Sequence, residues 1–298
     1  MPNSVYWNGR LCRSGAIPVD PADHGLLYGV GFFETFRTSG GEPHDWARHG
    51  RRLEGACAVA GIVPPAGYLV GGGKRLRRFV RALLKAHGLD DGVFRYTITA
   101  GPRLGRFGSA PYPGPSEMLS VRPLPPPSPP SGVALRVLAL RRDGGEWRPR
   151  PKSLSCANAL TGARELEARA LAPSDEGLFL SRSGQYVVET TRQNVAWIVD
   201  GCLRYPSPSV GPVAGTCLDW VLERVDRARS CRSRLDDLLR ADAVVVLNAV
   251  RGVTPVEEVW PLDDRSRLGS FRSSGHPLVR KLRAKWRESL RATAGVTG

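Results

Sequence analysis

The sequence predicts an α/β (α+β) fold in two domains, and three observations lead to this prediction. The chain has 298 residues, which is long enough for two modest domains. Short apolar runs of strand length alternate with longer amphipathic runs of helix length. A proline-rich run at 123–131 can form neither a helix nor a central strand. We therefore expect a small N-terminal domain at 1–122, a linker at 123–131 and a larger C-terminal domain at 132–298.

The N-terminal part is expected to combine short strands with two helices. Residues 5–9, 34–38 and 94–100 have the length and composition of short strands. Residues 45–62 and 73–89 repeat their apolar positions at helical spacing, which predicts two helices that each bury one stripe.

The C-terminal part follows the same alternation. Strands are predicted at 133–140, 177–181, 185–189, 195–199 and 243–247. The last of these is apolar throughout, which is typical of a strand buried on both faces. Helices are predicted at 157–171, 216–228 and 277–294.

The composition is that of an ordinary soluble globular protein. Hydrophobic residues make up 41% of the chain, and no apolar run approaches the ~20 residues that span a bilayer. The N-terminus lacks the basic and apolar segments of a signal peptide, so we expect a cytoplasmic protein without a membrane partner. Six widely spaced cysteines without a C-x-x-C pair indicate reduced thiols and no metal site.

The net charge of +15 raises the hypothesis of nucleic-acid binding. The basic residues are spread along the whole chain and are interleaved with acidic ones, as in Thr-Gly-Ala-Arg-Glu-Leu-Glu-Ala-Arg. A cationic pocket for an acidic small molecule explains this distribution more simply. We expect no nucleic-acid partner.

Lysine is rare in this chain, and one lysine stands in an unusual place. Only five of the 43 basic residues are lysine, and Lys152 lies in Arg-Pro-Arg-Pro-Lys-Ser-Leu. Arginine stays protonated in proteins, whereas lysine can lose its proton and attack a carbonyl group. The alternative interpretation is a surface lysine without a chemical role.

Two later segments carry groups that would complement a reactive lysine. Glu189 ends an apolar strand, where a buried carboxylate needs a partner. Gly211-Pro-Val-Ala-Gly215-Thr216-Cys217 opens a helix, and free amides at such a start can bind a phosphate. The alternatives are a satisfied carboxylate at a strand edge and an ordinary capped helix. Together, a lysine, a carboxylate and a phosphate cradle are what pyridoxal 5'-phosphate (PLP) requires.

Several motifs resemble one enzyme family in order and spacing. They are Val5-Tyr-Trp-Asn-Gly9, the glycine-rich turn Asp23–Thr35 ending in Phe-Phe-Glu-Thr, His49-Gly-Arg-Arg-Leu53, Pro151-Lys152-Ser-Leu, Glu189 followed by Asn194, Gly215-Thr216-Cys217 and Asn248–Val256. The chain thus resembles the class IV (fold type IV) PLP enzymes, which include aminotransferases and aminodeoxychorismate lyase. The resemblance implies a homodimer, with PLP in the cleft between a small and a larger domain.

The resemblance also implies roles for individual residues. Lys152 would be the catalytic residue that forms the Schiff base, and Glu189 would pair with the pyridine nitrogen. Other cofactor-binding positions would be Arg52, Thr191, Asn194, Gly215, Thr216 and Cys217. The substrate, a small carboxylated amine, would meet Phe33, Arg37, Arg95, Asn248 and Ala249. Arg37 and Arg95 are assigned to its carboxylate, because the arginine side chain can donate two parallel hydrogen bonds. The alternative interpretation is that both are exposed arginines on strands.

Two reactions are compatible with these residues. Transamination between a small amino acid and a keto acid is the broader activity of the family, and Arg37 and Arg95 favour it. Elimination of the aminodeoxychorismate lyase type, which yields 4-aminobenzoate and pyruvate, is the alternative. The Asn248-Ala249 pair favours that second reaction.

Overall fold

The computed structural model describes residues 4–65, 73–103, 111–127, 129, 131–142, 147, 149–169, 171–263 and 266–295. They form two compact units. The first contains Met1–Pro125, Pro151–Ser155 and Glu288–Gly298, and the second contains Pro126–Arg150 and Cys156–Arg287. The division at Pro125 lies within the proline-rich run. The units are not continuous along the chain, however, because the segment that carries Lys152 belongs to the first one.

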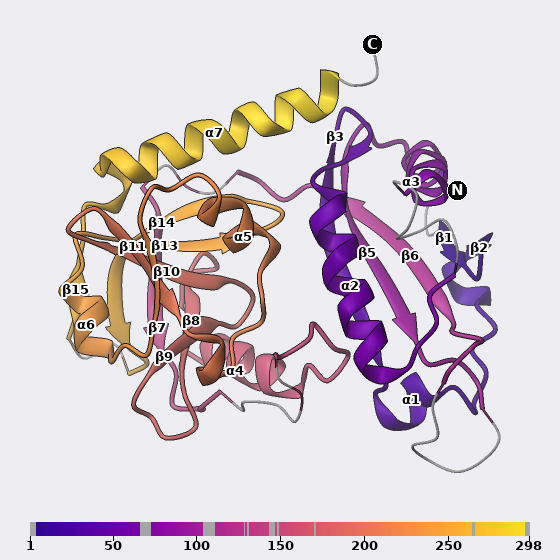
Figure 1. Cartoon of the computed structure of the whole chain (residues 1–298), viewed down its shortest axis with the longest axis horizontal. Helices are drawn as coiled ribbons and strands as arrows, with labels where there is room; N and C mark the ends of the chain where they lie inside the picture. The colour runs from indigo at the N-terminus through magenta and orange to yellow at the C-terminus, as the bar shows by residue number, and fades with distance from the viewer. Residues whose placement is uncertain are drawn as a thin grey trace. The chain divides into compact units, whose positions relative to one another are not determined.

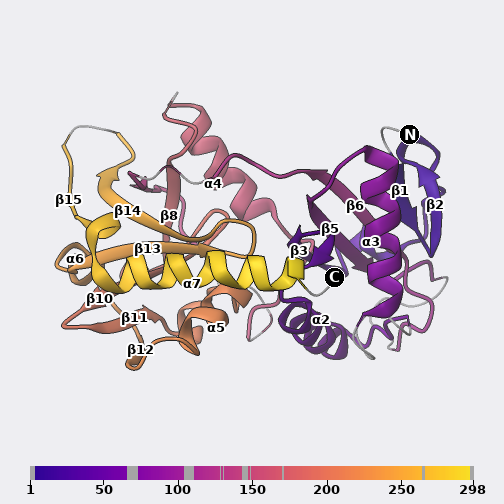
Figure 2. The ribbon, with the colours of Figure 1, turned by 90° about the horizontal axis from the view of Figure 1, so that it is seen from above.

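The first unit is built on an antiparallel sheet in the order β2-β1-β6-β5-β3-β4. Its strands are β1 (Ser4–Trp7), β2 (Arg10–Arg13), β3 (Gly31–Ser39), β4 (Glu42–Pro43), β5 (Gly92–Thr99) and β6 (Glu117–Pro123). Its helical segments are η1 (Ser14–Ala16), α1 (His24–Tyr28), α2 (Trp46–Ala60) and α3 (Lys74–His87). Figures 1 and 2 show α2 and α3 beside the strands of this sheet.

Strand alternation explains why both helices cover the same face of this sheet. Phe36 of β3 packs edge-on against Trp46 of α2, with ring centroids 5.0 Å apart. Tyr6 of β1 stacks on Phe79 of α3 at 3.9 Å. The helices end where Gly61 and Gly88 adopt left-handed backbone conformations, which favour glycine.

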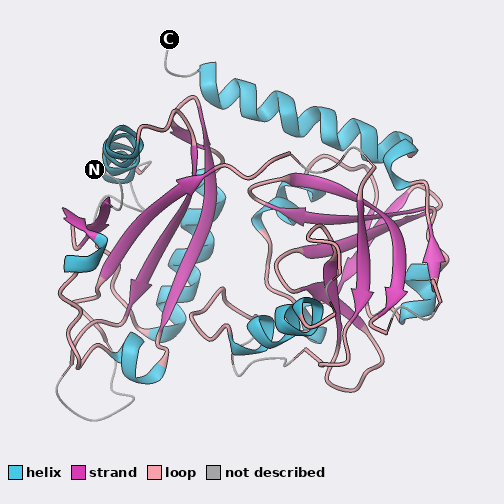
Figure 3. Ribbon diagram, turned by 180° about the vertical axis from the view of Figure 1, so that it is seen from behind, coloured by secondary structure: helices cyan, strands magenta, loops and turns pink. Residues whose placement is uncertain are grey.

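The second unit contains a nine-stranded mixed sheet in the order β12-β11-β10-β13-β14-β7-β8-β9, with β15 paired to β14. Figure 3 shows these strands in magenta. They are β7 (Val133–Val137), β8 (Glu176–Leu180), β9 (Val187–Thr190), β10 (Asn194–Val199), β11 (Cys202–Pro206), β12 (Ala228–Cys231), β13 (Ala243–Asn248), β14 (Gly252–Pro261) and β15 (Gly269–Ser270). The helical segments are α4 (Ala157–Glu167), η2 (Pro208–Val210), α5 (Thr216–Leu222), α6 (Leu235–Leu239), η3 (Ser273–Gly275) and α7 (Pro277–Ala294). The last turns of α7, from Glu288 onward, are assigned to the first unit.

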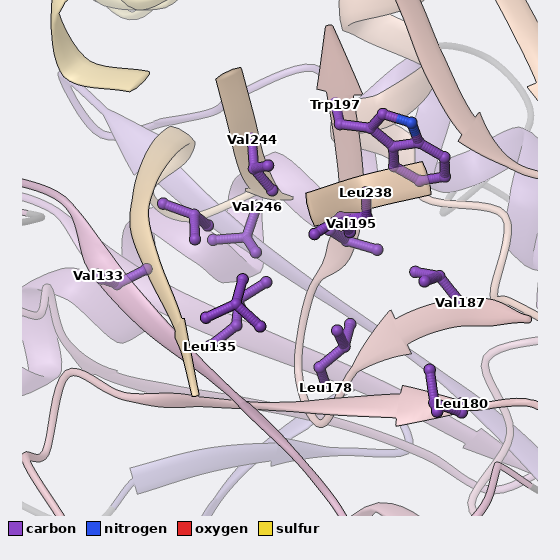
Figure 4. Close-up of a cluster of buried hydrophobic side chains, with 12 residues drawn as sticks. Val133, Leu135, Leu178, Leu180, Val187, Val195, Trp197, Leu238, Val244 and Val246 are labelled. Carbon is purple, nitrogen blue, oxygen red and sulfur yellow. The ribbon is translucent and has the colours of Figure 1, made fainter. Parts of the chain in front are cut away.

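A cluster of aliphatic side chains and one tryptophan forms the core of the second unit (Figure 4). Leu135, Leu178, Trp197 and Val244 come from four different strands of the sheet and are fully buried there. The predicted strand at 243–247 is confirmed as β13, and it is buried along its length from Ala243 to Leu247.

The predicted fold class is confirmed, and most predicted elements lie within a few residues of the observed ones. The helix predicted at 277–294 has those bounds in the structure. The helix predicted at 216–228 is wrong in its second half, because α5 ends at Leu222 and residue 228 begins β12. Charged residues at Glu223, Arg224 and Asp226 interrupt the apolar stripe there, so the amphipathic pattern of the helix ends.

Among the described residues, no helix is both long and apolar enough to cross a membrane.

Candidate active site

In the first unit, Lys152 lies on an extended segment that pairs with β3. The amide of Phe33 donates to the carbonyl of Lys152 at 3.0 Å, and the amide of Leu154 donates to the carbonyl of Gly31 at 3.0 Å. The ammonium nitrogen of Lys152 lies 4.7 Å from the centroid of the Phe33 ring. Backbone pairing and this cation–π contact therefore fix the lysine beside one aromatic side chain.

A second cation contacts the same aromatic ring. The guanidinium carbon of Arg95 lies 3.5 Å from the Phe33 centroid, and its Nε donates to the hydroxyl of Thr97 at 3.3 Å. Phe33 pairs with Thr97 across β3 and β5, so both project on the same face of the sheet. Three of the predicted site residues, Phe33, Arg95 and Lys152, are thus brought together.

Arg37 lies on the same strand face, two positions beyond Thr35, which pairs with Arg95. Its Nε donates to the carbonyl of its neighbour Thr38 at 3.3 Å. Burial lowers the pKa of the Arg37 guanidinium, and the carboxylate of Asp91 opposes that shift. The structure therefore places Arg37 next to Asp91, apart from the Phe33 ring contacts of Arg95 and Lys152.

On the helix-covered face of the sheet, Arg52 is oriented by a buried carboxylate. Its Nε donates to Oε1 of Glu34 at 2.8 Å, and its Nη2 donates to Oε2 at 2.5 Å. Nδ1 of His49 lies 2.6 Å from the same Oε2. Burial alone would raise the pKa of Glu34, but the charge of Arg52 and the bonds from both side chains lower it to about 2.

In the second unit, Glu189 at the end of β9 is buried and has both carboxylate oxygens occupied. Oε1 accepts a hydrogen bond from Nε of Arg142 at 2.8 Å, and Nη2 of the same guanidinium lies 2.6 Å from Oε1 in an ion pair. Oε2 accepts from the amide of Val213 at 3.0 Å. These partners replace the hydration that the carboxylate loses on burial.

The loop before α5 is held by two predicted site residues. Glu189 binds the amide of Val213, and Nδ2 of Asn194 donates to its carbonyl at 2.9 Å. A Cβ atom on Gly215 would lie 1.7 Å from Oδ1 of Asn194, so only glycine fits at that point. The loop thereby reaches the start of α5, where Thr216 and Cys217 are both buried.

Thr191 and Asn248 differ in how their polar groups are used. The hydroxyl of Thr191 is buried and has no hydrogen-bond partner among the described residues. Oδ1 of Asn248 accepts from the amides of Val250 and Arg251 at 2.9 and 2.8 Å. Its Nδ2 donates to Oε1 of Gln193 at 2.6 Å, so Asn248 connects the turn that carries Ala249 to the turn after β9.

Sequence reasoning did not identify Glu34, His49, Arg142 and Gln193 as site residues. Glu34 and His49 lie inside two of the family motifs, but the predicted roles there went to their neighbours Phe33 and Arg52. Arg142 is 47 positions from Glu189, and no local pattern around it signals the pairing.

The chain belongs to the class IV aminotransferase family: the family profile described as "Amino-transferase class IV" matches residues 31–259. It is similar to the aminodeoxychorismate lyase of Bacillus subtilis (strain 168). The two are 31% identical over 285 residues, which cover 93% of this chain and 94% of that protein.

Solved structures show the same fold. The 4-amino-4-deoxychorismate lyase of Pseudomonas aeruginosa matches with a TM-score of 0.77 and 26% identity, over 95% of this chain and 98% of that one. The branched-chain aminotransferase of Thermoproteus uzoniensis, solved with norvaline, matches with a TM-score of 0.79 and 21% identity. That match covers 98% of this chain and 95% of the aminotransferase. The predicted fold type IV architecture is therefore confirmed.

Proposed function

We propose that this chain is a PLP-dependent enzyme in which Lys152 moves a proton at the α-carbon of a small carboxylated amine. The observation that carries this proposal is the placement of Lys152 and Arg95 against the single ring of Phe33. A guanidinium is suited to a carboxylate, and an amine is suited to proton transfer. Their proximity suits a substrate whose carboxylate and reacting carbon are neighbours.

The residues present fit PLP, which supplies an electron sink for loss of the α-proton when it is bound. Lys152 would hold the cofactor covalently, and Glu189 would accept a hydrogen bond from the ring nitrogen. Arg52, Thr191, Thr216 and Cys217 would contact the phosphate. The buried hydroxyl of Thr191, which has no hydrogen-bond partner within the described part of the chain, supports this assignment. Asn194 would hold the loop that presents Gly215.

Two reactions remain candidates, and each has support. Transamination between a small amino acid and a keto acid is supported by Arg95, and by Arg37 on the same strand face, as anchors for carboxylates. Elimination to 4-aminobenzoate and pyruvate is supported by the similarity to proteins named aminodeoxychorismate lyase. In both reactions, Lys152 would take the α-proton. The reactions differ at the neighbouring carbon, which loses a leaving group in the elimination and keeps its substituents in the transamination.

Incubation of the purified protein with aminodeoxychorismate, and separately with amino acid and keto acid pairs, distinguishes these reactions. Release of 4-aminobenzoate and pyruvate in equal amounts would establish the lyase. Exchange of an amino group without 4-aminobenzoate would establish the aminotransferase.

The assignment of Lys152 is tested by reduction with borohydride and peptide mapping. We expect the PLP-loaded protein to lose its visible absorption band and to carry the label on Lys152. The Lys152→Arg variant should lose essentially all activity, because a permanently protonated guanidinium can neither attack a carbonyl nor accept a proton. Lys281→Arg, on an exposed position of α7, is the matched control and should keep full activity. A label on another lysine would refute the assignment.

We also propose a homodimer that acts in the cytoplasm. The family resemblance supports the dimer, and six cysteines without disulfides suit a reducing compartment. Light scattering coupled to size-exclusion chromatography would give twice the chain mass of 32.4 kDa, whereas a monomer mass would contradict the proposal.

A further inference from the structure

Contacts with four other residues hold Arg142 in place. Its Nε donates to Oε1 of Glu189, and its Nη2 lies 2.6 Å from the same oxygen. Its Nη1 donates to Oδ1 of Asn158 at 2.8 Å. Its guanidinium carbon lies 5.1 Å from the centroid of the buried Phe179 ring. Its own amide donates to the carbonyl of Leu180 at 2.7 Å. Only 6% of the Arg142 side chain is exposed, so the guanidinium has little freedom to reorient.

These contacts determine which part of Glu189 can meet a ligand. A carboxylate offers about four lone-pair sites. Two donors of Arg142 occupy Oε1, and the Val213 amide occupies one site of Oε2. Within the described chain this leaves one acceptor site, on Oε2. A single site in a fixed position is suited to a single N–H donor.

The side from which Arg142 approaches also matters. A buried carboxylate needs a partner, because its lost hydration must be replaced by hydrogen bonds and opposite charge. Arg142 provides that pairing at Oε1, so it takes up no acceptor site of Oε2.

We propose that Arg142 is a positioning residue that acts through Glu189 on the ring nitrogen of the cofactor. It orients the carboxylate, pairs with it at Oε1 and leaves one acceptor site on Oε2 for the ring N–H. The inference rests on the proposed function, because it takes Glu189 as the partner of that nitrogen.

The test compares PLP with 1-deazapyridoxal phosphate, in which a C–H group replaces the ring nitrogen. Both ligands are titrated into the apoprotein, and the ratio of their dissociation constants is measured. We expect the wild-type chain to bind PLP at least about tenfold more tightly, since a hydrogen bond to a charged group contributes roughly 1.5–3 kcal/mol. In Arg142→Met this ratio should fall to near one, because the affinity for PLP is lost selectively.

Arg136→Met is the matched control. Arg136 forms a comparable buried pair with Asp175 in the same unit, with Nε donating to Oδ2 at 2.8 Å. Its loss should lower stability and leave the ratio at the wild-type value. If Arg142 had a purely structural role, its replacement would weaken the binding of both ligands equally. A general loosening of the fold would do the same.

Four outcomes would overturn a claim, and they are distinguishable. A wild-type ratio near one, or an unchanged ratio in Arg142→Met, would overturn the role of Arg142 while leaving PLP binding intact. Failure of the wild-type chain to bind either ligand would instead overturn the proposed function. If Arg142→Met does not fold, Arg142→Lys keeps the cation and removes the two-pronged geometry. Its ratio should lie below that of the wild type, and an unchanged ratio would again overturn the proposal.

Discussion

The carboxylate of Glu34 shows how single residues prepare the site in the first unit. It is buried, yet His49 and Arg52 donate to it at distances of 2.5–2.8 Å. A buried ion pair contributes little net stability compared with apolar packing, but removal of one partner is strongly destabilising. Glu34 therefore keeps Arg52 in place for its proposed contact with the cofactor phosphate.

Acid should destabilise the protein through Glu34. Its pKa of about 2 in the folded protein lies below the ordinary value of 4.5, so folding favours the ionised form. The resulting stability is fully present above about pH 4.5 and is lost as the pH falls toward 2. We expect Glu34→Gln to lower the free energy of unfolding by on the order of 3 kcal/mol at pH 7.

Urea unfolding at a series of pH values measures this effect. The variant should show a weaker loss of stability than the wild type between pH 4.5 and the lowest usable pH. Glu288→Gln, at an exposed position of α7, serves as the surface control. If the free energy of unfolding changed with pH in the same way for the wild type and Glu34→Gln, Glu34 would not be the source of the acid sensitivity.

A second prediction at the residue scale concerns Gly215. A methyl group there would collide with Oδ1 of Asn194, so the Asn194 side chain must move. Its Nδ2 would then lose the hydrogen bond that it donates to the Val213 carbonyl. Gly215→Ala should therefore cost about 1–3 kcal/mol and weaken PLP binding about tenfold or more. Calorimetric titration with PLP measures the affinity. Gly275→Ala, where nothing lies within 4 Å of the new Cβ, should bind PLP like the wild type.

At the scale of elements, two glycines within helices have opposite surroundings. Gly55 in α2 is exposed, and a Cβ there would meet nothing within 4 Å. Gly162 in α4 faces the core, and its Cβ would lie 2.6 Å from the Phe179 ring and 2.9 Å from Leu138. Close packing of α4 on β8 thus depends on Gly162, whereas α2 gains nothing from Gly55.

Alanine at the two positions should change stability in opposite directions. Gly55→Ala should raise the free energy of unfolding by about 0.5–1 kcal/mol, because alanine loses less backbone entropy in a helix. Gly162→Ala should lower it by about 1–3 kcal/mol through overpacking. Chemical denaturation of both variants checks this, and the same sign for both would show that the surroundings do not decide the outcome.

Helix boundaries illustrate which elements a sequence pattern can locate. The bounds of α7 were predicted because its apolar stripe and its first proline are both local signals. The strand β12 was not predicted, since its residues are mostly exposed and it exists through parallel pairing with β11. Pairing partners of that kind lie outside any local window of sequence.

For the whole molecule, stability comes from packing and polar pairs, without covalent cross-links between cysteines. All six cysteines are described, and none of them forms a disulfide. The melting temperature should therefore be the same with and without a reducing agent, and thiol titration of the unfolded chain should find six groups. A lower melting temperature under reducing conditions would reveal a disulfide and contradict this prediction.

The sequence by itself determined the fold class, the places of most helices and strands, and the family motifs around Lys152, Glu189 and Gly215. These follow from local periodicity and from short spacings that a linear chain displays directly. Only the tertiary structure decided which groups meet: Arg95 with Lys152 on one ring, Glu34 with Arg52, and Arg142 with Glu189. Such contacts join residues far apart in sequence, and only folding and the burial of charge select their partners.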